Sequence, residues 1–163
     1  MTRDTPVVTD TGPLTHLGQA NALDLLDQFG PLLVPEAVFA ELQVGGLPAG
    51  IDTVDRERRS VEIPDDRWQS LDPGERAALV LCRRVDGTLL TDDLDARKKA
   101  DELGIEVHGS IGVVLAAYAN GLIDDERARA TIRALESDST LYLSPPLVER
   151  AIDRIDDGGP AEP

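Results

Sequence analysis

Hydrophobic residues along the chain form short apolar runs that alternate with longer stretches of helical spacing. The runs at 6–9, 32–34, 88–91 and 105–108 predict strands. Weaker runs at 61–63 and 140–143 are candidates for further edge strands. Strands that alternate with helices are typical of βα units, so the pattern predicts an α/β fold around a mostly parallel sheet.

The intervening stretches predict helices, and several carry recognisable start signals. The Asp-Pro-Gly-Glu sequence at 72–75 starts one helix, with Asp72 as the N-cap and Glu75 completing a capping box. Either Asp92 or Asp93 caps a later helix, and Ser110 caps the one after it. The predicted helices span 21–29, 35–42, 73–84, 94–103, 111–120, 124–136 and 145–155.

The length of 163 residues suits one compact domain. No internal repeat or linker interrupts the pattern, so we expect a single domain over 5–155. The polar end at 156–163, rich in Gly and Pro, predicts a disordered tail.

The charge of the chain is strongly acidic, with 16 Lys+Arg against 31 Asp+Glu and a formal net charge of −15. Lys98 and Lys99 are the only lysines, and Asp outnumbers Glu. Hydrated carboxylates with few lysines suggest a halophilic protein, because molar salt shortens the Debye length to about 3 Å and screens the repulsion. An ordinary acidic protein is the alternative.

Cys82 is the only cysteine, which excludes an intrachain disulfide and a thiolate zinc site. It lies in an apolar run and is interpreted as a core residue. No stretch has the apolar length of a membrane span, and the first residues show no signal region. We therefore expect a cytoplasmic protein with no membrane association.

The composition also argues against two kinds of nucleic-acid binder. A net charge of −15 disfavours binding through a basic surface. Aromatic residues make up only 3% of the chain, which is a poor supply for the stacking platforms of single-strand-binding modules.

Acidic residues follow the predicted strands. Asp10 follows the first strand, and Asp92 and Asp93 follow the strand at 88–91. Glu41 and Glu75 lie on helices that can face the same sheet edge. Each acid alone has an ordinary explanation as a turn, cap or solvated helix residue. Together, carboxylates at the carboxyl edge of a parallel sheet favour a hard divalent cation, Mg²⁺ or Mn²⁺, and metal-assisted phosphodiester hydrolysis.

Five segments occur in an order that closely resembles the PIN-domain superfamily. They are Asp-Thr-Gly-Pro-Leu at 10–14, Pro-Glu-Ala-Val-Phe-Ala-Glu-Leu at 35–42, Gly-Glu-Arg-Ala-Ala at 74–78, Leu-Thr-Asp-Asp-Leu-Asp-Ala-Arg at 90–97 and Gly-Ser-Ile-Gly-Val-Val-Leu at 109–115. Within the superfamily, the chain resembles the VapC-like branch catalogued as a domain of unknown function. The resemblance implies a three-layer α/β/α sandwich and a ribonuclease that depends on Mg²⁺ or Mn²⁺.

The resemblance also implies roles for individual residues. Asp10, Glu41, Glu75 and Asp93 match the acidic cluster of the family, with Asp92 as an alternative metal ligand to Asp93. Many relatives carry Asp where this chain has Glu75. Thr11 and Ser110 match a hydroxyl residue that accompanies the acids. Arg97 is a candidate phosphate contact on the basis of its place behind the acidic turn, with a solvated ion-paired face as the alternative.

By resemblance, the protein would be the toxin of a toxin–antitoxin pair, a homodimer that a small antitoxin protein silences. The competing hypothesis is a PIN-like interaction module with weak or no catalysis, which the departure at Glu75 supports. The net charge is compatible with RNA as substrate if contact runs through bridging metal ions and a few local arginines, in salt that screens long-range repulsion.

Overall fold

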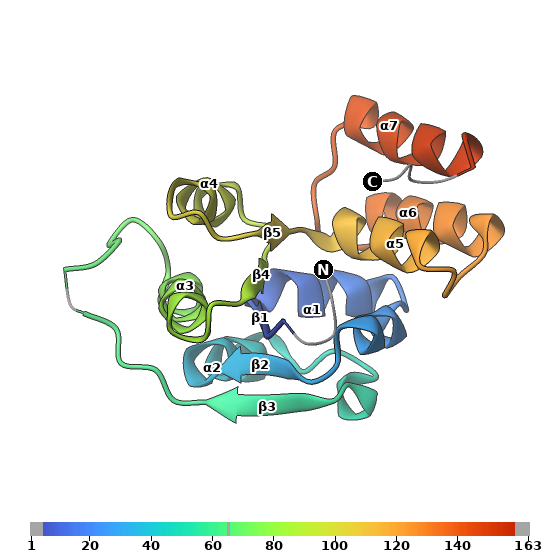
Figure 1. Cartoon of the computed structure of the whole chain (residues 1–163). Coiled ribbons are helices and arrows are strands. Elements are labelled where there is room, and N and C mark those ends of the chain that lie inside the picture. The colour runs from blue at the N-terminus through green and yellow to red at the C-terminus, as the bar shows by residue number, and fades with distance from the viewer. Residues whose placement is uncertain (1–4, 65, 159–163) are drawn as a thin grey trace.

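A computed structural model describes residues 5–64 and 66–158, and its centre is a sheet in which all the strand pairs are parallel (Figure 1). The sheet has five strands in the order β3-β2-β1-β4-β5. The strands are β1 (Val7–Thr9), β2 (Leu32–Pro35), β3 (Arg56–Arg59), β4 (Thr88–Leu90) and β5 (Val107–His108). The predicted α/β fold with a parallel sheet is confirmed.

Helices connect the strands and cover both faces of the sheet. They are α1 (Thr11–Gln19), α2 (Glu36–Gly45), α3 (Pro73–Val85), α4 (Leu94–Glu102), α5 (Ser110–Ala119), α6 (Asp125–Asp138) and α7 (Pro145–Asp156). Two 3₁₀ helices, η1 (Leu23–Phe29) and η2 (Ile51–Thr53), complete the described part of the chain.

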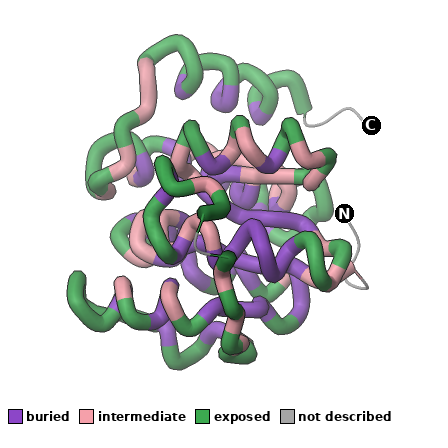
Figure 2. Tube along the Cα trace, turned by 90° about the vertical axis from the view of Figure 1, so that its left-hand side faces the viewer, coloured by how far each residue is buried: buried purple, intermediate pink, exposed green. Residues whose placement is uncertain are grey.

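Alternate residues of the strands face two separate hydrophobic clusters, which define the three layers. Val8, Leu33 and Leu89 pack with α3 and α4 on one face. Val7 and Leu90 pack on the other face, in the larger cluster that includes α1, α5, α6 and α7. Figure 2 shows the buried positions gathered in the centre, with the topmost helix, α7, buried on one side only.

The main differences from the predicted elements lie at the start and in the middle of the chain. The sequence predicted no helix at residues 11–19, but they form α1, because Asp10 caps the helix and Pro13 falls in its first turn. The segment predicted as a helix at 21–29 is the 3₁₀ helix η1. Gly109, rather than Ser110, is the N-cap of α5, and Ser110 is its first residue.

Both candidate edge strands are wrong. The outer strand is β3, whose sequence Arg-Glu-Arg-Arg lacks an apolar alternation because it pairs only with β2 and remains largely exposed. Residues 61–63 and 140–143 form no strand. In the second segment, the backbone N–H groups of Thr140 and Leu141 donate to side-chain oxygens of Gln19 and Ser139 instead of to a neighbouring strand.

The C-terminal end of the predicted domain coincides with α7. Asp156, where the predicted tail begins, is the last residue of α7, and residues 159–163 lie outside the described residues. Across the described chain, every helix is too short or too polar to cross a membrane. Cys82 is buried in the cluster beneath α3, as predicted, and burial raises the pKa of its thiol to about 12.

Candidate metal centre

The junction of β1 and α1 holds Asp10 in a fixed position at the carboxyl edge of the sheet. Its backbone N–H donates to the carbonyl oxygen of Leu90 in β4 (2.9 Å). Its Oδ1 accepts from the backbone N–H of Thr11 (2.8 Å), and its Oδ2 accepts from Thr91 Oγ1 (2.8 Å). The residue is only 4% exposed. Two hydrogen bonds therefore fix a buried carboxylate where the first helix begins.

Glu41 reaches the same place from the neighbouring helix α2. Thr11 Oγ1 donates to its Oε1 (2.6 Å), and the backbone N–H of Gly74 donates to its Oε2 (2.9 Å). The carboxylate of Glu41 thus links the first turns of α1 and α3. A Cβ at Gly74 would lie 2.6 Å from Glu41 Oε2, so any larger residue there would displace this carboxylate.

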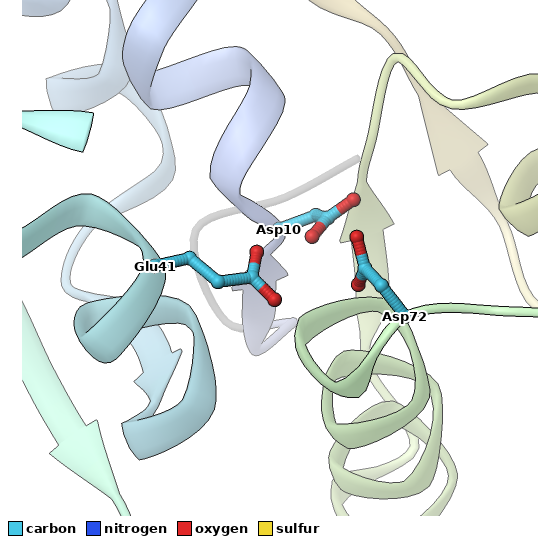
Figure 3. Close-up of side chains that lie close together, drawn as sticks. All are labelled: Asp10, Glu41 and Asp72. Atoms are coloured by element: carbon cyan, nitrogen blue, oxygen red, sulfur yellow. The ribbon is translucent and has the colours of Figure 1, made fainter. Parts of the chain in front are cut away.

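Asp72 is the third member of the cluster. Asp10, Glu41 and Asp72 each offer one carboxylate oxygen, and these oxygens lie within 4.8 Å of one another (Figure 3). From the sequence, Asp72 was expected only as the N-cap of α3. It is that cap, accepting from the backbone N–H of Glu75 (2.8 Å), and it also lies in the acidic cluster.

Glu75 completes the capping box, as predicted, but is not among the three clustered residues. Its Oε1 accepts from the backbone N–H of Asp72 (3.0 Å). The three clustered residues line a hollow in the surface with a volume of about 340 Å³, and Glu75 lines it too. The residues lining this acidic hollow are Asp10, Thr11, Gly12, His16, Glu41, Asp72, Glu75, Asp92, Asp93, Thr140, Leu141 and Tyr142.

The electrostatics of the acidic hollow show negative charge that is not balanced. Burial, with smaller contributions from the charges of Asp72 and Glu41, raises the pKa of Asp10 to about 6. Burial also raises the pKa of Glu75 to about 7, and the charges of Asp72, Asp10 and Asp93 add to the effect. None of four carboxylates of the hollow forms an ion pair with a described residue: those of Asp10, Glu41, Asp72 and Glu75.

Asp92 and Asp93 lie at the exit of β4 but have different surroundings. Asp93 caps α4 by accepting from the backbone N–H of Ala96 (2.9 Å). Asp92 Oδ1 accepts from the backbone N–H of Ser110 (2.6 Å), while its Oδ2 accepts from Ser110 Oγ (2.6 Å) and lies 2.8 Å from His16 Nδ1. Both oxygens of Asp92 are therefore engaged in joining α1, α4 and α5.

The pKa of Asp92 reflects this network. Burial alone would raise the pKa, but the hydrogen bonds from His16 and Ser110 bring it below its usual value. Asp92 is therefore ionised at neutral pH, and the Nδ1 of His16 donates to it. The expected hydroxyl residues Thr11 and Ser110 both donate to carboxylates, Thr11 to Glu41 and Ser110 to Asp92.

Arg97 lies beside the acidic hollow rather than in it. A Cβ added to Gly109 would meet both Arg97 Nη1 and Asp92 Oδ1, so the guanidinium lies against the backbone of Gly109 next to Asp92. Within the described part of the chain, no ion pair involves Arg97, whereas Lys99 pairs with Glu102 (3.0 Å). The positive charge of Arg97 is therefore available to an anion.

The chain matches a known protein family over nearly its whole length. A family model described as a PIN domain, DUF3368, matches residues 6–157, which is nearly the whole chain. The chain belongs to this PIN domain family. PIN domains are generally nucleases, and the family resemblance in the sequence is thereby confirmed.

Comparison with solved structures supports the fold of this PIN domain. A PilT N-terminus domain protein from the hyperthermophilic archaeon Sulfolobus solfataricus is similar, with a TM-score of 0.55 and 16% identity. The similarity covers 66% of this chain and 88% of that chain. At this identity, the comparison shows the fold alone. The search of curated proteins gives no match.

We expect that replacing Gly74 by alanine in this PIN domain weakens Mn²⁺ binding by about 10- to 100-fold, the usual range for residues that support metal ligands. The added Cβ would push the carboxylate of Glu41 away from the cluster. The free energy of unfolding should fall by about 1 to 3 kcal/mol, because the displaced carboxylate loses its hydrogen bonds from Thr11 and Gly74. Calorimetric titration with Mn²⁺ measures the effect.

Gly45→Ala is the matched control for this experiment. Gly45 ends α2, the helix that carries Glu41, and a Cβ there would meet nothing within 4 Å. We expect it to bind Mn²⁺ like the parent chain. Equal affinities for Gly74→Ala and Gly45→Ala would contradict the placement of Glu41 in a metal site.

Replacing Asp92 by alanine should lower the unfolding free energy by about 2 to 3 kcal/mol, because it leaves the buried Ser110 amide and hydroxyl without partners. Urea denaturation monitored by circular dichroism measures the change. As a control, Asp101→Ala removes an exposed carboxylate near the end of α4 and should change stability by less than about 0.5 kcal/mol. A similarly small effect of Asp92→Ala would show that the network does not stabilise the fold.

Proposed function

We propose that the chain is a ribonuclease that depends on Mg²⁺ or Mn²⁺ and hydrolyses RNA phosphodiesters. The observation that carries this proposal is the convergence of Asp10, Glu41 and Asp72 within 4.8 Å at the carboxyl edge of the sheet. Membership of the PIN domain family, whose members are generally nucleases, supports it.

The residues present fit a divalent cation. Asp10 is buried without a cationic partner among the described residues, and its raised pKa reflects the cost of this unbalanced charge. Carboxylate oxygens are the ligands that Mg²⁺ and Mn²⁺ prefer, and no thiolate or imidazole belongs to the described cluster. When bound, such an ion supplies positive charge that activates a water and stabilises the phosphate oxygens.

Within this proposal, Asp10, Glu41 and Asp72 hold the ion. Glu75 and Asp93 line the same acidic hollow, from which they complete the coordination through water or a second ion. Of the two alternatives at the exit of β4, Asp93 suits this role better, because Asp92 accepts three hydrogen bonds, one of them from His16, whereas among the described residues Asp93 accepts only the one from the backbone N–H of Ala96.

The remaining residues position these groups and bind the substrate. Thr11 and Thr91 orient Glu41 and Asp10 by donating hydrogen bonds to them. Ser110 holds Asp92 and thereby the start of α5. Arg97 provides an unpaired guanidinium beside the hollow, which suits a phosphate of the RNA next to the one that is cleaved.

Cleavage assays with the purified chain test this function. Single-stranded RNA and single-stranded DNA of the same sequence are incubated with Mg²⁺, with Mn²⁺ or with chelator, at low and at molar KCl. We expect RNA cleavage only in the presence of the metal. The two salt concentrations also test the halophilic hypothesis, which requires folding and activity to improve in molar KCl. No RNA cleavage under any of these conditions would contradict the proposal.

We further propose that the protein acts in the cytoplasm as the homodimeric toxin of a toxin–antitoxin pair. The VapC-like features of the sequence support this role. Induced expression should arrest growth, and coexpression of a small protein encoded beside this gene should relieve the arrest. The mass of the purified chain in light scattering tests the homodimer. Normal growth at high expression of an active nuclease would contradict the toxin role.

A further inference from the structure

One aromatic side chain stands out by its exposure. All five aromatic residues lie in the described part of the chain; Phe29 and Phe39 are buried, and Trp68 and Tyr118 are partly buried. Tyr142 is 82% exposed. A large apolar ring left in solvent has a hydration cost, and such positions on a protein surface often mark contacts with a ligand.

Tyr142 lies where two hollows meet. It lines the acidic hollow with Asp10 and Glu41, and it also lines an adjacent hollow of about 290 Å³. Asp92, Leu141 and Tyr142 line both, so the two hollows are adjacent. The ring is therefore placed at the border of the candidate metal centre rather than on a remote surface.

The backbone that carries Tyr142 is held in place. Gln19 Oε1 accepts from the backbone N–H of Thr140 (2.8 Å) and from its Oγ1 (3.2 Å), while Ser139 Oγ accepts from the backbone N–H of Leu141 (3.1 Å). The two bonds to Gln19 hold the segment between α6 and α7 against α1. A ring on a fixed backbone loses little conformational freedom when a ligand packs against it.

The adjacent hollow combines apolar surface with a positive charge. Leu94 and Leu147, both exposed, line it together with Tyr142, and Arg97 lines it from α4. An apolar surface beside an unpaired guanidinium matches a nucleotide, which has a flat base and an anionic phosphate.

We propose that Tyr142 stacks on a base of single-stranded RNA next to the phosphodiester that is cleaved. The inference rests on the proposed ribonuclease function and names a base subsite for it. A protein partner on this surface is the alternative that the experiments below distinguish. Stacking also fits the strongly acidic chain, since contact with a base face does not depend on a basic surface.

Binding of fluorescently labelled single-stranded RNA, measured by anisotropy in an Asp10→Asn background that prevents cleavage, tests the proposal. Tyr142→Ala should weaken binding by about 5- to 100-fold, the range for loss of one stacked base, and Tyr142→Phe should restore it. Leu122→Ala, which removes an exposed apolar side chain from a different hollow, serves as the matched control and should bind like its parent.

Two further measurements separate stacking from other contacts. The Tyr142→Ala effect should persist in molar KCl, because stacking is not an ionic contact, whereas the effect of Arg97→Gln should shrink. RNA with one abasic nucleotide beside the cleaved bond should bind Tyr142→Ala and its parent equally, because the base that the ring would contact is missing. Unchanged melting temperature of Tyr142→Ala excludes a folding defect.

The outcomes distinguish this inference from the proposed function. Cleavage by the parent chain together with unchanged RNA binding and cleavage by Tyr142→Ala would overturn the inference and leave the ribonuclease function standing. Loss of self-association in Tyr142→Ala without loss of RNA affinity would also overturn it, since the surface would then bind protein. RNA binding that depends on Tyr142 in a chain without cleavage would support the subsite and contradict the function.

Discussion

Replacing Asp10 by asparagine should lower metal-dependent RNA cleavage by a factor on the order of 10³ or more, because it removes a buried anionic ligand at the centre of the cluster. Asparagine keeps the size of the side chain and one acceptor oxygen, so it still serves the backbone N–H of Thr11. Initial rates on a single-stranded RNA in saturating Mn²⁺, with and without chelator, measure the loss.

Asp101→Asn is the control for this substitution. It makes the same change of charge at an exposed position on α4, and its cleavage rate should equal that of the parent chain. Retained metal-dependent cleavage by Asp10→Asn would show that the acidic hollow is not the active site. Absence of cleavage in the parent chain as well would favour the alternative of a PIN-like module that binds a partner without catalysis.

The fold was predictable because its signals are local. The capping box at Asp72 and Glu75 and the alternation of strands and helices depend on residues close together in sequence. The strand β3 was missed because its charged sequence has no apolar alternation, and only its pairing with β2 makes it a strand. The helix α1 was missed because Gly12 and Pro13 resemble a turn, although proline is tolerated in the first turn of a helix.

The candidate site was predictable only in part for the same reason. Asp10 and Glu41 were expected at the sheet edge, and the structure brings them together. Asp72 was overlooked because its capping role explained it fully, and its approach to Glu41 depends on the packing of α2 against α3. The sequence favoured Asp93 and left Asp92 as the alternative; the different hydrogen bonds of Asp92 arise from His16 and Ser110, which are distant in the chain.

The metal-free protein should lose stability as the pH rises from about 4 to about 7. The folded pKa of Asp10 is about 6 against a usual value of 3.8, so the folded state binds more protons than the unfolded state within that window. Ionisation of Asp10 therefore costs folding free energy as the pH rises, by about 2 to 3 kcal/mol once it is complete. Glu75, whose pKa is raised to about 7, extends the window upward and contributes less because it is partly exposed.

Asp10→Asn isolates this contribution because it cannot ionise. In chelator at pH 7.5, Asp10→Asn should be more stable than the parent chain by up to about 2 to 3 kcal/mol, and at pH 4 the two should be nearly equal. Urea denaturation across this pH range, with Asp101→Asn as the control for charge, measures the difference. A constant difference at all pH values would mean that the Asp10 carboxylate is not destabilised by burial.

A divalent cation should reverse the order of stability at pH 7.5. Binding to the folded state alone stabilises it by about 4.1 kcal/mol at a concentration one thousand times the Kd, and the parent chain should show this gain in Mn²⁺. Asp10→Asn should gain far less, because the cluster loses a charged ligand. The same carboxylate would then destabilise the empty site and stabilise the loaded one, which is the behaviour expected of a metal ligand rather than a structural acid. Equal gains in both chains would place the bound ion elsewhere.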